Sequence, residues 1–270
     1  ADFIDDTVDR HIIPLKYNFG EKCYLDKVSQ TSNEFYTELI NNPQHPQTSQ
    51  PSPGDFRRQY QFLNTHYKSV ISIHIPQKLS GTLQSAKTAL KRIPNTNITI
   101  IDSLSVSVGQ GLIATYAAKL VQDGMDHSKI VQNINKIIKK TNLYASVKDL
   151  TYGVKGGRIP KSKKIISDLF SIKPVLTTGD DGTMKVAGVL LGTKNRPKKL
   201  SKLLLKKHNP KFSYNINIAH SNCVDEANTL SDLLKSKFNN IQDIPIFELG
   251  CALGVHTGPG ALVIGIQRIN

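Results

Sequence analysis

Hydrophobic and polar residues alternate over residues 70–75, and the pattern then changes to helical spacing over residues 82–90. A short apolar stretch at 98–101 has the composition of a buried strand. Apolar side chains recur at helical spacing over 112–121 and again over 130–138. Strand, helix, strand and helix at this interval predict a parallel sheet that is covered by helices on both faces.

The second half of the chain has a different pattern. Strands are expected in succession at 143–147, 172–176, 184–191, 214–219, 244–247 and 261–266, with helices near 164–170 and 224–238. A turn at 180–182 (DDG) predicts a hairpin, so part of this sheet should be antiparallel. We therefore expect an α/β protein of two domains with a ligand between them. These are a parallel-sheet domain over 1–145 and a mixed or antiparallel α/β domain over 146–270.

Hydroxyl groups meet a predicted helix start at two places. One is the corner at 80–82 (SGT), between the strand at 70–75 and the following helix. The other is a proline-rich loop with Thr48 and Ser49, which leads into a helix capped by Ser52. The first N–H groups of a helix lack intrahelical acceptors and its dipole is positive there, so such corners can hold a carboxylate or a phosphate.

Composition restricts the class of protein. An apolar content of 39% is ordinary for a globular protein, and no apolar run approaches the length of a membrane-spanning helix. The acidic first residues lack the layout of a secretory signal, so we expect a cytoplasmic protein. Three cysteines without metal-site spacing are expected to be reduced, and no metal site is predicted.

The formal net charge of +14 has more than one explanation. The runs at 155–164 and 194–207 are rich in lysine and contain no acidic residue. A solvated surface, a docking face for an acidic partner and a nucleic-acid-binding surface all remain open. Neither run contains an aromatic residue for base stacking, so nucleic acid is not the expected partner.

A second class of function is a serine-type hydrolase with Ser80 as nucleophile and His256 as base. Residues 256–260 (HTGPG) place an imidazole at a tight turn before the last strand. However, the chain contains no G-x-S-x-G nucleophile elbow, which disfavours this alternative.

Taken together, six motifs resemble those of the DegV family in kind and order. They are TSQPS at 48–52, LSGTLQSA at 79–86, DS at 102–103, GGRI at 156–159, IKPVL at 172–176 and HTGPGA at 256–261. The resemblance spans about 12–266. It implies a two-domain carrier, not itself an enzyme, that buries one long-chain fatty acid and needs no cofactor. It further implies that a dihydroxyacetone-kinase-like kinase phosphorylates the carboxylate to an acyl phosphate for phospholipid metabolism.

The resemblance also implies the roles of individual residues. Thr48 and Ser80 would bind the carboxylate, and the residues expected close by are Ser49, Gly81, Thr82 and His256. Arg158 and Lys155 would belong to the kinase-facing side, and no residue is assigned a catalytic role. Transient contact with a membrane surface is a further expectation.

The beginning of the chain departs from the family pattern. Members usually start with an apolar strand before the one that matches 12–19, and here only a short acidic segment precedes it. A sheet without a central strand would leave ladder groups unpaired. We therefore expect a fragment of a longer parent, with the kinase module fused upstream as one possibility.

Overall fold

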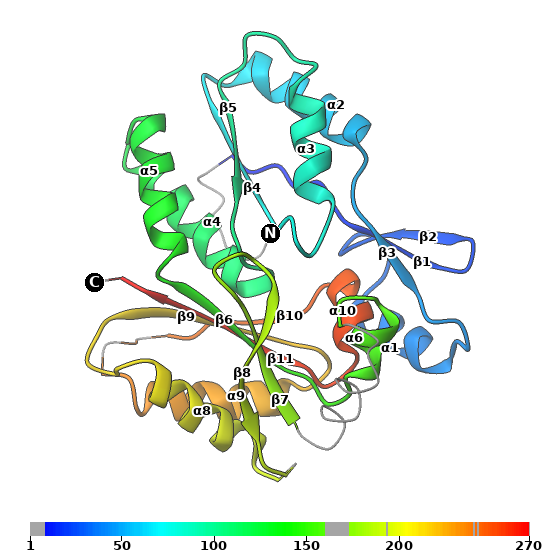
Figure 1. Cartoon of the computed structure of the whole chain (residues 1–270), viewed down its shortest axis with the longest axis vertical. Coiled ribbons are helices and arrows are strands. Elements are labelled where there is room, and N and C mark those ends of the chain that lie inside the picture. Colours follow the sequence, from blue (N-terminus) through cyan, green and yellow to red (C-terminus); the bar gives the residue numbers. More distant parts are fainter. Residues whose placement is uncertain (1–8, 160–172, 193, 240, 242, 270) are drawn as a thin grey trace.

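The computed structural model describes residues 9–159, 173–192, 194–239, 241 and 243–269 (Figure 1). Its strands form a three-stranded sheet of order β2-β1-β3, a parallel pair β4-β5 and a six-stranded sheet of order β10-β9-β11-β6-β7-β8. The predicted α/β class, with a parallel sheet followed by a mixed one, is confirmed. No helix in these ranges is both long and apolar enough to cross a membrane.

The first sheet is antiparallel and small. It consists of β1 (Lys16–Phe19), β2 (Lys22–Leu25) and β3 (Gln47–Ser49). The strand expected at 12–19 is therefore only half as long as predicted. The proline-rich segment with Thr48 and Ser49 was expected to be a loop, and the structure instead forms the short strand β3 there. The neighbouring prolines exclude a helix, but they allow a short strand at the edge of a sheet. The α1 helix (Ser32–Asn41) starts with a capping box of Thr31 and Glu34.

The parallel pair carries helices on both faces, as predicted. β4 (Val70–His74) lies beside β5 (Ile98–Asp102). The helices α2 (Pro53–His66) and α3 (Thr82–Leu90) bury their apolar sides against Ile98 and Ile100. The helices α4 (Ser107–Gln122) and α5 (His127–Ile138) bury theirs against Ile101 and its neighbours (Figure 1).

The six-stranded sheet is mixed. Its strands are β6 (Thr141–Ser146), β7 (Lys173–Thr178), β8 (Met184–Leu190), β9 (Tyr214–His220), β10 (Ile246–Glu248) and β11 (Leu262–Arg268). Only the β9–β10 pair is parallel, and β7–β8 is the predicted hairpin. The helices α8 (Arg196–Lys207) and α9 (Val224–Lys235) pack against this sheet. β6 begins at Thr141 and pairs with β7 and β11, so it belongs to this sheet; the division at 145/146 remains a prediction.

Three helices were not predicted: α6 (Thr151–Lys155), α8 and α10 (Cys251–Thr257). α6 and α10 are too short to show apolar periodicity. In α8 the many lysines obscure the apolar period, although Leu200 and Leu204 form a buried stripe. The helix expected at 164–170 lies outside the described residues. The same is true of Ile172 and of residues 1–8, where the missing family strand would fall.

Candidate functional site

A partly open cavity of ≈ 130 Å³ lies behind the predicted corner at 80–82. Its walls come from the six-stranded sheet, from α6 and α10, and from the segments around β3 and before α3. Most lining side chains are apolar: Leu15, Ile75, Leu79, Val106, Leu143, Ala145, Val147, Leu150, Ile159, Leu176, Met184, Leu253 and Val263. Thr48, Ser49, Gln50, Ser80, Arg158, His256 and Thr257 add the polar groups.

The first polar contact joins an early and a late segment of the chain. Thr48 Oγ1, on β3, lies 2.9 Å from His256 Nε2, on α10. Burial, with a smaller contribution in the same direction from the nearby Arg158, lowers the pKa of His256 to about 4. The imidazole is therefore neutral at physiological pH. If its proton is on Nε2, the ring donates to Thr48 and leaves the threonine O–H available as a donor.

The second polar contact lies at the start of α3. Ser80 Oγ is 2.8 Å from Thr82 Oγ1, and it accepts a hydrogen bond from Thr82 N at 3.3 Å. Gly81 is the N-cap residue, and the amide of Gln50 packs against it so closely that a Cβ at this position would lie 2.8 Å from Gln50 Nε2. Gln50 therefore joins the β3 segment to the Ser80 corner.

α10 determines where His256 lies. Residues 256–260 were expected to form a turn, but His256 lies in the last turn of this helix and the turn begins after it. Gly258 ends the helix with a φ of 64°, a conformation that favours glycine. At the other end, Asp26 Oδ1 accepts a hydrogen bond from Ala252 N at 3.2 Å. The helix is thus held at both ends.

The GGRI motif contributes a close backbone approach as well as a basic side chain. Gly156 follows α6 directly beneath the His256 ring, where a Cβ would clash with Nδ1. Arg158 donates from Nε to the Leu79 carbonyl at 3.3 Å and from a terminal nitrogen to the Gly156 carbonyl at 2.9 Å. It is exposed and lines the cavity, whereas the exposed Lys155 does not.

These contacts link most of the predicted site residues into one polar cluster. Thr48, Ser49, Ser80 and His256 line the same cavity, while Gly81 and Thr82 support Ser80 from the side. Gln50 and the walls from α6 and α10 were missed. Gln50 was already visible in the TSQPS motif, but the two short helices left no periodic signal.

The geometry does not favour the hydrolase alternative. His256 Nε2 is bonded to Thr48, and the Ser80 hydroxyl is bonded to Thr82, so a serine–histidine pair is not formed. Across the described ranges, no three or more His, Cys, Asp or Glu residues are grouped so that they could hold a metal ion.

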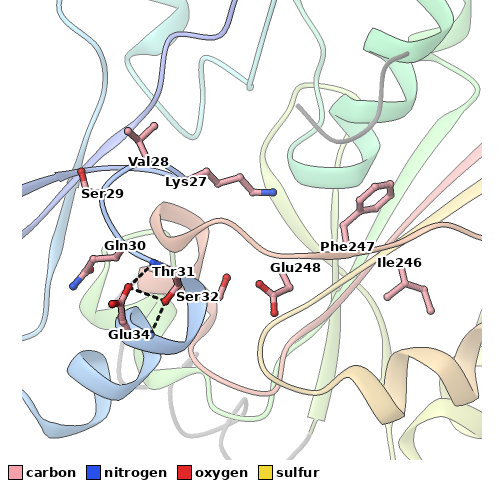
Figure 2. Close-up of a pocket in the computed structure, with 10 residues that line it drawn as sticks. All are labelled: Lys27, Val28, Ser29, Gln30, Thr31, Ser32, Glu34, Ile246, Phe247 and Glu248. Carbon is pink, nitrogen blue, oxygen red and sulfur yellow. Dashed lines mark hydrogen bonds between the residues drawn. The ribbon is translucent and has the colours of Figure 1, made fainter. Parts of the chain in front are cut away.

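A larger hollow of ≈ 670 Å³ lies elsewhere, between residues 27–34 and β10 (Figure 2). Figure 2 shows Lys27 on one side of it and Glu248 on the other, with the α1 capping box at its edge. None of the predicted site residues lines this hollow. Its charged and polar side chains are poorly suited to an apolar ligand.

The fold and the cavity define a class: an α/β protein with a partly open, mostly apolar cavity whose polar end carries hydroxyl groups and a neutral imidazole. A family model described as "Uncharacterised protein, DegV family" matches residues 5–268. The chain belongs to the DegV family. It is 31% identical over 252 residues to a DegV domain-containing protein of Halalkalibacterium halodurans, covering 93% of this chain and 88% of that protein.

Two solved structures have the same fold and are more than 25% identical to this chain in sequence. The fatty acid binding DegV family protein of Streptococcus agalactiae is 28% identical with a TM-score of 0.88, covering 99% of this chain and 95% of that one. DegV of Bacillus subtilis, described as a fatty acid binding protein, is 27% identical with a TM-score of 0.86, covering 96% and 91%. The resemblance stated from the sequence motifs is confirmed.

Proposed function

We propose that this protein is a carrier that buries one long-chain fatty acid and presents its carboxylate to a kinase. The observation that carries the proposal is the cavity itself, which combines apolar walls with a cluster of neutral donors. The fatty-acid-binding relatives from Streptococcus agalactiae and Bacillus subtilis support the same ligand class.

Burial of the acyl chain supplies the affinity. Each buried methylene contributes about 0.8 kcal/mol, so a long chain gains on the order of 10 kcal/mol before the costs of ordering and association. The walls suit this role because Leu143, Ala145 and Val263 are buried residues of the six-stranded sheet. Met184, on the β7–β8 hairpin, adds an adaptable side chain to the lining.

The carboxylate must find donors, because an unpaired buried charge is costly. Ser80 accepts a hydrogen bond from Thr82 N, and with the His256 proton on Nε2 Thr48 accepts one from the ring, so each hydroxyl can then donate its own proton to the ligand. Ser49, Gly81 and Thr82 complete the immediate surroundings. Neutral donors hold the anion without the permanent charge pair that a buried lysine would form.

The same cluster explains how a carboxylate could be phosphorylated while the tail stays buried. One carboxylate oxygen attacks the phosphorus of a donor bound by the kinase. A new O–P bond forms, the bond to the leaving group breaks, and an acyl phosphate results. Arg158 lies exposed at the polar cluster and Lys155 lies exposed beside it, so both are assigned to the kinase-facing surface. Exchange of the fatty acid at a membrane surface belongs to the same proposal.

The direct test is denaturation of the purified protein, organic extraction and mass spectrometry for acyl chains, followed by titration of delipidated protein with palmitate and oleate. We expect about one fatty acid per chain. A protein that carries no lipid and takes up neither fatty acid would overturn the proposal. Adding a dihydroxyacetone-kinase-like subunit and its phosphoryl donor to the loaded carrier then tests for the acyl phosphate.

A further inference from the structure

A third concave site lies far from the cavity. It has a volume of ≈ 480 Å³ and is formed by the ends of α5 and α8, the start of β6 and the end of β11. Four cationic side chains line it: Lys139, Lys140, Lys207 and Arg268. We call this site the basic hollow.

The basic hollow is at the opposite end of the six-stranded sheet from the proposed carboxylate site. Arg268 pairs with Tyr214 at one end of β11, whereas the cavity-lining Val263 pairs with Ala145 and Ala219 near the other end. Five residues along a strand correspond to about 17 Å. Docking of a kinase at the carboxylate therefore does not explain the positive charge of the basic hollow.

Among the residues that the structure describes, none neutralises the charge of the basic hollow. No acidic residue lines it, and none of its four cations forms an ion pair with an acidic residue in the described ranges. Lysines after a helix commonly offset the negative end of the helix dipole, which is about half a charge per helix. Two helix ends offset about one of the four charges, so a net charge of about +3 remains.

The Arg268 side chain and the backbone beside it are also held in place. The guanidinium carbon of Arg268 lies 5.0 Å from the centre of the Phe212 ring, and Arg268 N donates to the Lys140 carbonyl at 3.0 Å. Behind them, Tyr144 Oη and His208 Nε2 are 2.9 Å apart. Burial lowers the pKa of His208 to about 4, with nearby Lys207 acting in the same direction, and burial raises the pKa of Tyr144 to about 12, so this pair carries no charge. Phe212 is 44% exposed and presents an aromatic surface next to the cations.

We propose that the basic hollow binds a small molecule that carries a polyphosphate group. Its volume is in the range of small-molecule sites, and several phosphate charges on one compact ligand match a net charge of about +3. A concave site of this size fits one such molecule better than the long groove that a nucleic-acid backbone follows. The ring of Phe212 offers a stacking surface for a nucleobase, which points to a nucleoside triphosphate within this class.

The experiment is isothermal titration of the full chain with ATP and with inorganic tripolyphosphate at physiological ionic strength. Arg268→Gln and Lys140→Gln should each weaken binding of both probes by about two- to fivefold. The matched control is Lys87→Gln, which removes an exposed lysine of α3, and it should leave binding unchanged. Two variants keep the test valid if one of them fails to fold.

Phe212→Ala separates the two forms of the ligand. If ATP binds more tightly than tripolyphosphate and only ATP weakens in this variant, the site accepts a nucleotide. If both probes bind equally, it accepts the polyphosphate group itself, and both results support the proposal. Absence of binding of either probe at about 1 mM, or equal weakening in the lysine control, overturns it. Binding of single-stranded RNA without ATP also overturns it. Palmitate uptake, measured in parallel, tests the carrier function separately.

Discussion

Replacing Thr48 with valine removes one hydroxyl from the polar cluster and leaves its shape nearly unchanged. Thr48 lies on β3 opposite Tyr17, where a β-branched residue suits the strand. Its Oγ1 contacts His256 Nε2 at 2.9 Å, so the change removes the partner of the imidazole and the proposed donor to the fatty-acid carboxylate. The backbone is expected to stay in place.

The magnitude follows from the charge of the ligand. A hydrogen bond to a charged group contributes about 1.5–3 kcal/mol, and each 1.4 kcal/mol is tenfold in affinity, so the Kd for palmitate should rise about 10- to 150-fold. The ligand-free protein should lose about 1 kcal/mol of its free energy of unfolding, because Nε2 keeps access to water through the cavity.

The assay is competition between palmitate and a fluorescent fatty acid on delipidated protein, with urea unfolding of the same samples. Thr48→Ser is the matched control, because it keeps the hydroxyl, and its Kd should stay close to that of the wild type. If Thr48→Val binds palmitate within about twofold of the wild type while folding normally, Thr48 is not a carboxylate ligand.

Three further changes test the surroundings of the site. Gly156→Ala places a Cβ against the His256 imidazole and should lower the free energy of unfolding in urea by about 1–3 kcal/mol. Gly54→Ala, where a Cβ has room, is the control. An unchanged urea midpoint in Gly156→Ala would contradict this prediction. Burial lowers the pKa of His74 to about 4, so the folded protein binds fewer protons than the unfolded chain between pH 6.5 and pH 4. This difference contributes up to about 3 kcal/mol to the free energy of unfolding above pH 6.5, and the contribution should be lost as the pH falls to 4. The loss of stability should be smaller in His74→Gln. An equal pH dependence in both proteins would remove His74 as the cause. Arg196→Met breaks a 2.7 Å pair between a buried guanidinium and the half-buried Glu226, which keeps Lys148 as a partner, and it should cost about 1–3 kcal/mol. Exposed Lys198→Met is the control and should change the stability little; equal effects of the two changes would show that the Arg196 pair does not stabilise the fold.

Local sequence signals were sufficient where the structure depends on neighbours in the chain. The capping boxes at Thr31 and Ser52, the corner at Gly81 and the β7–β8 hairpin all follow from side chains that satisfy or restrict the adjacent backbone. The motifs that resemble the DegV family are also short and contiguous. They were therefore enough to predict the fold class and most residues of the polar cluster.

Other features came only from tertiary packing. α6 and α10 have 5 and 7 residues, too few for an apolar period, and α10 packs against Phe35 and Tyr36 from the beginning of the chain. The contact between Thr48 and His256 joins residues 208 positions apart, and the basic hollow collects cations from three separate segments. The sequence by itself determined the residue types, the helix caps and the turns, because backbone preferences of this kind depend only on neighbouring residues. Which of them meet was decided by the tertiary structure, because only the packing of sheets and helices brings distant side chains within bonding distance.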